Sequence, residues 1–283
     1  MKEKIVNYAF QGRLDRFLRR YFPYLPQSLI EKHIRKGEVK KNNKRTKSSD
    51  RVFENDIVAY PQIFETFVSY ENTSLKDPYL YEQFQKLKVF ETQEFCVIKK
   101  PYNLATQGGS KIKYSLDAMA NAGPHQHFLV HRLDKHTTGL LILAKNPITA
   151  NVFMHQFREK KIQKYYLALI KKRPLKDSGL IDLPLYDAEA KVTVDFEKGK
   201  VAKTRYRVLG QYGDVYVILL KPYTGRKHQL RIHLKEGLNT PIIGDEKYEG
   251  MHAQRMYLQA YKVKIPGYQP IKIACDFEIE NNL

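Results

Sequence analysis

The spacing of apolar residues changes along the chain and separates two regions. In RLDRFLRRYF, near the N-terminus, apolar side chains recur every three or four positions, which predicts an amphipathic helix. A second helix is predicted through SLIEKHIRK, with Gly37 as its C-terminal cap. The stretch that follows, up to residue 61, indicates short strands joined by turn-prone Asn, Asp and Glu residues. We therefore predict an N-terminal domain over residues 1–61, built from two helices and a β-hairpin.

From about residue 91 the pattern changes to strand-length runs rich in Val, Ile, Leu and Tyr. These runs are EFCVIKKP, HFLVHR, GLLILAKN, KYYLALIKK, AKTRYRVLGQYGDVYVILLKP, RMYLQAYKVKIP and IKIACDFEI. Helices are predicted only over NPITANVFMHQFREKK and over HQLRIHLKEG, which ends at Gly237. The pattern predicts a larger α+β domain over residues 91–283, with a central mixed, mostly antiparallel β-sheet flanked by few helices. Residues 62–90 show no strict period and are interpreted as a linker.

The charge of the chain indicates its class of partner. Lys and Arg number 49 against 30 Asp and Glu, a net charge of +19. The first 60 residues hold 15 basic against 7 acidic residues, or +8 of that total. Such an excess points to a polyanion, with nucleic acid as the leading candidate. The alternative is a basic but merely solvated surface.

Several classes of protein are disfavoured by missing patterns. The chain has no apolar run of membrane-spanning length and no signal peptide at its start, so we expect a soluble, cytoplasmic protein. Cys96 and Cys275 lie in strand-like segments without metal-ligand spacing and are expected to be reduced core residues. P-loop, HExxH and GxSxG patterns do not occur. We therefore expect no metal and no cofactor.

The stretch HRLDKHTTGLLILAKN places charges ahead of an apolar run. We expect a strand that ends at Arg132 and Asp134, then the polar turn KHTTG, then a buried strand. A carboxylate in this position has three interpretations. Asp134 caps the turn, pairs structurally with Arg132, or faces a functional site.

A second stretch, PYTGRKHQLRIHLKEGLNTPIIGDEKY, gathers basic residues on a predicted helix. Lys227 and Arg231 are four positions apart, and so are Arg231 and Lys235. Like charges at this spacing repel unless an anion or a carboxylate faces them, so a partner is implied. The same stretch contains His228, His233 and Asp245; read alone, it also fits a solvated helix face. What remains is metal-free chemistry by one carboxylate beside an arginine and an aromatic residue.

These motifs resemble those of the RluA-type RNA pseudouridine synthases. HRLDKHTTG is similar to the family signature HRLDxxTSG, and the other matching stretches follow in family order across roughly residues 90–260. They are KKPYNLATQGG, KIQKYYLALI, TGRKHQLRIHL, PIIGDEKY and RMYLQA. LATQGGS and IQKYYLAL look most like the RluC-type members, which act on 23S ribosomal RNA. The resemblance thus implies isomerisation of uridine to pseudouridine in structured RNA, foremost large-subunit ribosomal RNA.

The resemblance assigns roles to individual residues. Asp134 stands in place of the catalytic aspartate, Tyr166 in place of the active-site tyrosine, and Arg231 in place of the arginine that pairs with the aspartate. Arg132 takes the place of the signature arginine that is linked to positioning the RNA and the flipped base. The chain departs from the family pattern at three positions: Thr138 for serine, Lys227 for threonine and Gln259 for histidine. The last two put only fine packing or RNA contacts in doubt.

The N-terminal region resembles the S-four-like RNA-binding domain, a common companion in this family. Its GRLDRFL, SLIEKHIRKGEVKKNNK and ENDIV stretches carry the likeness. Such a domain would grip RNA phosphates with basic side chains of its two helices. The alternative is that these basic side chains only form the solvent-exposed faces of the two helices. The residues expected to bind RNA across the chain are Arg16, Arg19, Arg20, Lys32, Arg35, Lys36, Arg132, Arg226 and Lys227.

The chemistry implied by the resemblance requires a flipped nucleotide and an ionised Asp134. Extruding the uridine costs a few kcal/mol, which phosphate contacts and packing in the pocket offset. An adjacent guanidinium keeps the carboxylate ionised. Asp134 then acts as nucleophile, as electrostatic stabiliser or as base leading to a glycal, and Tyr166 or a water removes the C5 proton. The alternative functions are a synthase acting on tRNA and a non-catalytic RNA-binding ribosome-assembly factor; a monomer is expected.

Overall fold

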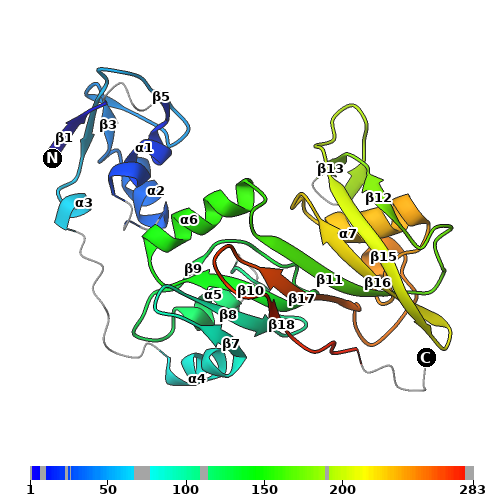
Figure 1. The fold of residues 1–283 in the computed structure, drawn as a ribbon. Helices are drawn as coiled ribbons and strands as arrows, with labels where there is room; N and C mark the ends of the chain where they lie inside the picture. The colour runs from blue at the N-terminus through cyan, green and yellow to red at the C-terminus, as the bar shows by residue number, and fades with distance from the viewer. Residues whose placement is uncertain are drawn as a thin grey trace. The chain divides into compact units, whose positions relative to one another are not determined.

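The computed structural model of the protein divides into two units, residues 1–74 and residues 75–283. It describes residues 2–6, 11–22, 25, 27–66, 77–108, 114–188 and 191–277. Figure 1 shows the smaller unit in blue and cyan and the larger one in teal to red. Each unit has a hydrophobic core of its own.

The smaller unit contains the two predicted helices, α1 (Leu14–Tyr21) and α2 (Gln27–Arg35). Their apolar faces supply Phe17, Leu18 and Ile30 to the core of this unit. Gly37 ends α2 in the left-handed region, where the N–H groups of residues 37 and 38 donate to carbonyl oxygens of the last helical turn. The strands are β1 Lys2–Ile5, β2 Gly12–Arg13, β3 Lys40–Lys41, β4 Lys44–Arg45, β5 Arg51–Val52 and β6 Ile57–Tyr60.

A hairpin follows the helices, as predicted. Strands β3 and β4 pair antiparallel, and Asn42 and Asn43 between them both have positive φ, as a tight two-residue hairpin turn requires. Strand order in the sheet is β1-β6-β3-β4, while β2 pairs with β5. Helix α3 (Ile63–Thr66) ends the described part of this unit.

The larger unit is built on one ten-stranded sheet. Its strands are β7 Lys88–Glu91, β8 Phe95–Lys100, β9 Phe128–Leu129, β10 Thr138–Ala144, β11 Gln163–Ile170, β12 Ser178–Asp182, β15 Lys203–Tyr212, β16 Val215–Pro222, β17 Leu258–Lys264 and β18 Ile271–Lys272. They run in the order β12-β15-β16-β11-β17-β10-β8-β7, with β18 beside β17 and β9 beside β10. Among these strands only β10 and β17 pair in parallel. The predicted α+β class with a mixed, mostly antiparallel sheet is confirmed.

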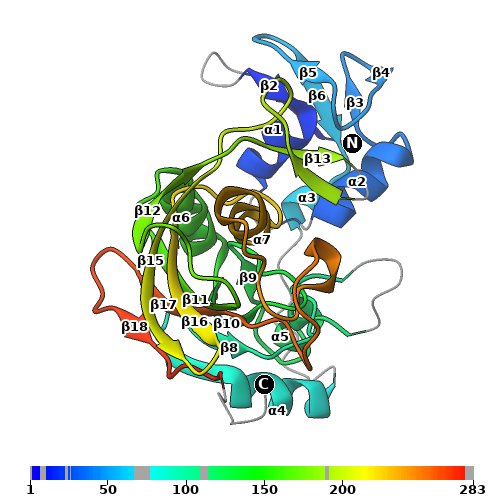
Figure 2. The same ribbon diagram turned by 90° about the vertical axis from the view of Figure 1, so that its right-hand side faces the viewer.

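Few helices accompany this sheet, as expected. They are α4 Pro78–Leu87, α5 Leu116–Ala120, α6 Pro147–Arg158 and α7 Gln229–Ile232, which continues as a π-helical turn over His233–Gly237, and a 3-10 turn spans Glu246–Tyr248. Figure 2 shows α6 and α7 beside the curved sheet. Helix α6 packs on the face of β10 that bears Leu140 and Ile142, whereas α7 supplies Leu230 to the core cluster that contains Leu141 and Leu143 of the other face. A separate hairpin joins β13 (Leu185–Ala188) and β14 (Lys191–Val194). No helix in the described ranges is long and apolar enough to cross a membrane.

The parallel contact between β10 and β17 depends on a glycine. Gly139 lies opposite Ala260 with φ of +105°, and a Cβ there would stand 2.3 Å from the Ala260 carbonyl oxygen. Only glycine permits this close approach without strain. All seven residues of β10 are buried, so the polar turn before it is held against the centre of the sheet.

Three expectations from the sequence are wrong. The predicted strand HFLVHR is a strand only at β9, because Leu133 forms its hydrogen bonds with Thr106 in place of a neighbouring strand. The predicted linker, residues 62–90, contains α3, α4 and part of β7; only Phe84 of α4 is buried, so no apolar period marked that helix. Cys275 is exposed, because β18 ends at Lys272 and leaves it outside the sheet.

Candidate active site

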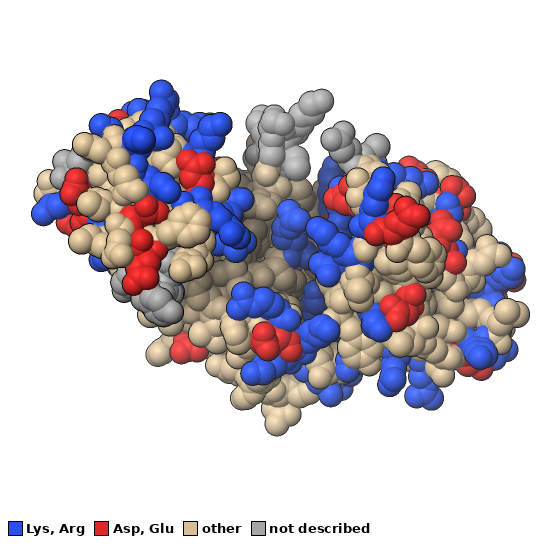
Figure 3. Space-filling view, turned by 90° about the horizontal axis from the view of Figure 1, so that it is seen from above, with Lys and Arg blue, Asp and Glu red and all other residues tan. Residues whose placement is uncertain are grey.

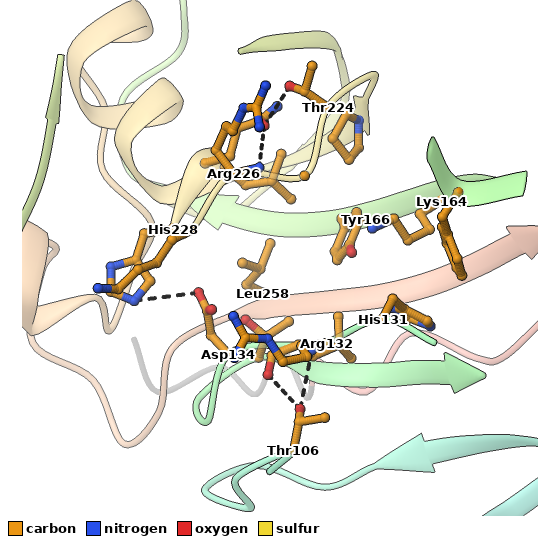
Figure 4. A pocket seen from close by; sticks show the side chains of 18 of the residues that line it. Thr106, His131, Arg132, Asp134, Lys164, Tyr166, Thr224, Arg226, His228 and Leu258 are labelled. Atoms are coloured by element: carbon orange, nitrogen blue, oxygen red, sulfur yellow. Dashed lines mark hydrogen bonds and ion pairs between the residues drawn. The ribbon is translucent and has the colours of Figure 1, made fainter. Parts of the chain in front are cut away.

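A cavity of about 990 Å³ in the larger unit brings the two charged sequence stretches together (Figure 4). The loop from Leu129 to Thr137 forms one wall and delivers Asp134. Strand β11 supplies Tyr166, and the segment from Lys221 in β16 to Arg231 in α7 forms another wall. The three predicted catalytic residues, Asp134, Tyr166 and Arg231, therefore line one cavity.

Hydrogen bonds fix the loop that carries Asp134. The Thr106 hydroxyl donates to the Leu133 carbonyl oxygen at 2.6 Å and accepts from the Leu133 N–H at 3.2 Å. Buried Lys100 donates from Nζ to three carbonyl oxygens, including that of Lys135, at 3.1 Å. The backbone on both sides of Asp134 is thus anchored, which fixes the position from which its side chain enters the cavity.

The Asp134 carboxylate faces two nitrogen-bearing side chains. Oδ2 lies 3.8 Å from Nη1 of Arg231 and 3.9 Å from Nε2 of His228. The Asp134 side chain is 31% exposed, so it is open to a substrate in the cavity. Of the three interpretations from the sequence, the one that faces a site agrees with this geometry; a hydrogen bond from the Thr137 N–H involves only the backbone carbonyl of Asp134.

Arg231 has a closer partner than Asp134. Its Nε and Nη2 donate to the two carboxylate oxygens of Asp245 at 2.7 and 2.6 Å, and the two side chains are 6% and 1% exposed. The guanidinium also lies 4.7 Å above the ring of Tyr248. Burial alone lowers the pKa of Arg231, but the hydrogen bonds and charge of Asp245, with the charge of Asp134, outweigh it and raise the pKa. Arg231 is therefore a fixed positive charge beside Asp134.

The backbone before Asp245 requires a glycine. Gly244 has φ of +79°, and a Cβ there would lie 1.8 Å from the Arg255 carbonyl oxygen. This tight turn brings the Asp245 carboxylate under the guanidinium. The expected pairing of Arg231 with Asp134 is thus supplemented by a bidentate pair that orients the arginine.

His228 is oriented by Tyr248. The Tyr248 hydroxyl accepts from the Val192 N–H at 3.3 Å and lies 2.7 Å from Nδ1 of His228. A Tyr248 hydroxyl that donates its proton to Nδ1 leaves the ring proton of a neutral His228 on Nε2, which faces Asp134. Burial lowers the pKa of His228 to about 4. The negative charge of Asp134 acts in the opposite direction but is the smaller effect, so the ring is neutral near pH 7. His228 also has a left-handed backbone, with φ of 50°, at the start of α7.

Tyr166 and Lys164 project from β11 toward the cavity (Figure 4). Tyr166 is buried, and burial, together with the negative charge of Asp134, raises the pKa of its phenol well above the ordinary value. Its hydroxyl is thus a neutral hydrogen-bond donor. Burial lowers the pKa of Lys164 to about 8. The cavity therefore has an aromatic ring and an ammonium on the same wall.

The expected RNA-binding residues are exposed, but not all are free of protein partners. Arg132 is exposed beside Asp134 on the cavity wall. Arg226 donates from Nε to the Val201 carbonyl oxygen at 3.1 Å, and Lys227 pairs with Asp187 at 2.8 Å. In the smaller unit, six expected residues are exposed on α1, α2 and the turn after α2: Arg16, Arg19, Arg20, Lys32, Arg35 and Lys36. Figure 3 shows basic side chains over both units in one view.

Each of the three basic residues spaced along the segment around Arg231 has an acidic partner, which offsets the predicted repulsion. Lys227 faces Asp187, Arg231 faces Asp245, and Lys235 faces Glu249 at 2.6 Å. The implied partner of Arg231 is thus a carboxylate of the protein.

Sequence reasoning missed Lys100, Thr106, Lys164 and Tyr248 as contributors. A lysine at the end of the apolar strand FCVIKK was the available signal for Lys100. His131 has a local structural role, since its Nε2 accepts from the Ile142 N–H at 3.0 Å. Buried Gln259, one of the departures from the family pattern, donates to the Ala274 carbonyl oxygen at 3.0 Å, a packing role.

Comparison with known proteins agrees with this geometry. The sequence profile of the family described as RNA pseudouridylate synthase matches residues 94–236. The chain belongs to this family. A Rickettsia bellii relative named ribosomal large subunit pseudouridine synthase C is 35% identical over 86% of this chain and 84% of its own length. A Vibrio vulnificus protein of the same name is 32% identical over 83% of this chain and 76% of its own length.

Solved structures of pseudouridylate synthases share the fold. Human RNA pseudouridylate synthase domain containing 4 aligns with a TM-score of 0.58 and 25% identity, over 70% of this chain and 90% of that one. Human RNA pseudouridylate synthase domain containing 1 aligns with a TM-score of 0.56 and 27% identity, over 66% and 81%. The predictions of an RNA pseudouridine synthase, and hence of an isomerase, are confirmed.

Proposed function

We propose that this pseudouridine synthase isomerises uridines of large-subunit ribosomal RNA and that Asp134 is its catalytic residue. The observation that carries the proposal is the placement of a partly exposed Asp134 carboxylate in a cavity, 3.8 Å from an arginine that is itself held by Asp245. The choice of RNA rests on the relatives, which are named for the ribosomal large subunit.

The target nucleotide must leave its helix to reach Asp134. Unstacking and unpairing cost a few kcal/mol, and the cavity offsets this cost with an aromatic face at Tyr166 and positive charge at Arg132 and Lys164. The volume of about 990 Å³ is in the range of ligand cavities, roughly 300 to 1,000 Å³. It leaves room for the detached uracil to turn.

The reaction breaks the bond between uracil N1 and ribose C1′ and forms a bond between C5 and C1′. The C5 proton is lost and N1 gains a proton, so nothing else is consumed. An ionised Asp134 has two routes: it attacks C1′ as a nucleophile, or it removes a ribose proton to give a glycal. Arg231 stabilises the carboxylate in either route.

Tyr166 and His228 have distinct parts in this proposal. With its raised pKa, the Tyr166 hydroxyl stays protonated and donates to the anionic uracil while the ring supports the base. It is a poor base in this state, so we assign removal of the C5 proton to a water. Neutral His228 points its Nε2 proton at Asp134 and thereby favours the carboxylate form.

We further propose that the smaller unit is an S-four-like RNA-binding domain. Its two helices, its hairpin and the six exposed basic residues of α1, α2 and the following turn support this. Such contacts attach to phosphates without reading sequence. The enzyme would act as a cytoplasmic monomer.

Tritium release tests the proposal. The protein is incubated with 23S ribosomal RNA and with tRNA transcripts that carry uridine tritiated at C5, with Asp134→Asn as the matched control. Release from the ribosomal transcript alone is expected, and release from tRNA alone would overturn the choice of RNA. Binding of both transcripts without release from either would favour the non-catalytic assembly factor.

A further inference from the structure

A group of lysines surrounds the Tyr165 ring at the end of three neighbouring strands, β11, β16 and β17. The Nζ atoms of Lys262, Lys221 and Lys264 lie 4.3, 5.4 and 5.9 Å from the ring centroid. Lys272 of β18 is directly opposite Lys262 in the sheet. We call these four lysines and Tyr165 the lysine patch.

The lysine patch has no acidic partner among the residues that the structure describes. The four ammonium groups make none of the ion pairs found in the described ranges, although Lys203 and Lys227 of the same unit each face an aspartate. Like charges directly opposite each other in a sheet are destabilising. Cation–π contacts with the partly buried Tyr165 ring offset only part of this repulsion. The patch therefore has the charge of a site for an anion from outside the chain.

The lysine patch shares two residues with the catalytic cavity, although Tyr165 lies on the other face of the sheet. Side chains alternate along a strand, so Tyr165 points to the opposite face of the sheet from Tyr166 and Lys164. Lys221 belongs to both sites, since it lines the cavity and its ammonium also lies 5.4 Å from the Tyr165 ring. Gln163 is shared in the same way: it lines the cavity and accepts a hydrogen bond from the Tyr165 hydroxyl at 2.9 Å.

We propose that the lysine patch binds the phosphate backbone of the substrate RNA where the strand leaves the catalytic cavity. This inference rests on the proposed function, because it takes the occupant of the cavity to be a flipped nucleotide. A strand that continues from the cavity past Lys221 meets Lys262 and Lys264 next. The phosphates neutralise the patch, and the Tyr165 and Tyr223 rings, which both contact Lys221, offer faces for a flanking base.

The double variant Lys262→Gln, Lys264→Gln tests the patch without altering a residue of the cavity. Its matched control is Lys172→Gln, Lys176→Gln, which removes the same charge from two exposed lysines in the loop after β11. Binding of a ribosomal RNA fragment that extends well beyond the target uridine is measured at several salt concentrations, beside an oligonucleotide just long enough to fill the cavity. Turnover at saturating RNA and thermal unfolding are measured on the same proteins.

We expect the patch variant to bind the long fragment roughly tenfold more weakly, and the slope of log affinity against log salt to become shallower by about 1.5, as for two lost phosphate contacts. Binding of the short oligonucleotide, turnover at saturating RNA and the melting temperature stay at wild-type values. An unchanged slope, or an equal loss in the control variant, would overturn the inference. Absence of pseudouridine from every RNA with the wild-type protein would instead refute the proposed function, while the binding series still reports on the patch.

Discussion

Arg231 and Asp245 form a buried ion pair in which Nε and Nη2 of the arginine donate to both carboxylate oxygens, at 2.7 and 2.6 Å. The remaining guanidinium nitrogen, Nη1, faces the cavity and lies 3.8 Å from Oδ2 of Asp134. The site therefore separates two tasks between two aspartates: Asp245 orients the guanidinium, and Asp134 stays open to the substrate.

Removing Asp245 is expected to cost stability as well as activity. Asp245→Leu leaves the buried Arg231 charge without its partner, which costs about 3 to 5 kcal/mol in the free energy of unfolding. Urea unfolding monitors the loss. The double variant Arg231→Met, Asp245→Leu should recover most of the stability but no pseudouridine formation. If the single variant unfolded at the wild-type urea concentration, the pair would not have the role described here.

Asp134→Asn is expected to abolish turnover while leaving the fold and the affinity for RNA nearly unchanged. The carboxylate is partly exposed, and its contacts are an ion pair of 3.8 Å with Arg231 and a 3.9 Å approach to the neutral His228 ring, so its loss should change the free energy of unfolding by less than about 1 kcal/mol. Pseudouridine formation, RNA affinity and urea unfolding are measured together. Activity that survives the substitution would contradict the assignment of Asp134.

Substitutions at Tyr166 separate its ring from its hydroxyl. Tyr166→Phe keeps an aromatic face and should lower turnover while leaving KM for the RNA close to wild type. Tyr166→Leu also removes base stacking, worth roughly 1 to 3 kcal/mol, and should raise KM as well. Steady-state kinetics on the same transcript distinguish the two. Equal effects of both variants on KM would show that the ring does not support the base.

The pH dependence of RNA affinity is expected to reveal Lys164. Burial lowers the pKa of this lysine to about 8, so its ammonium is charged below that pH and neutral above it. Affinity should therefore fall as the pH rises through about 8. Lys164 packs near Phe157 and His131, and His131 stays neutral throughout because burial lowers its pKa well below the ordinary value.

Lys164→Arg provides the control for this pH effect, because a guanidinium remains charged over the whole range. The variant should bind RNA with an affinity that does not change near pH 8. Fluorescence anisotropy titrations at about pH 6 to 10 would measure both proteins. An identical pH profile for wild type and variant would assign the titration to another group.

The sequence predicted the elements whose pattern is uniform along their length. Helix α6 and strand β10 have a clear period or a continuous apolar run, and both are found where expected. Helix α4 was missed because a single side chain, Phe84, is buried in its ten residues. The apolar residues of the loop around Asp134 predict a strand, but they pack into the core without pairing to a neighbouring strand. Sequence alone does not distinguish a buried loop from a buried strand.

The candidate site was predictable only in part. Motif order placed Asp134, Tyr166 and Arg231 in one site by resemblance, and the cavity contains all three. Which of two aspartates holds Arg231 depends on the turn at Gly244, a tertiary contact with Arg255 that no local pattern reports. The contribution of Tyr248 likewise depends on its approach to His228 from a distant segment.

The central position of β17 has a consequence for synthesis of the chain. Residues 258–264 occupy the middle of the sheet, between β11, which bears Tyr166, and β10, which follows Asp134. While β17 is still inside the ribosome during synthesis, β11 and β10 lack the strand that joins them in the sheet. We therefore expect catalytic competence to arise late in translation, in one step, when this strand inserts beside Gly139.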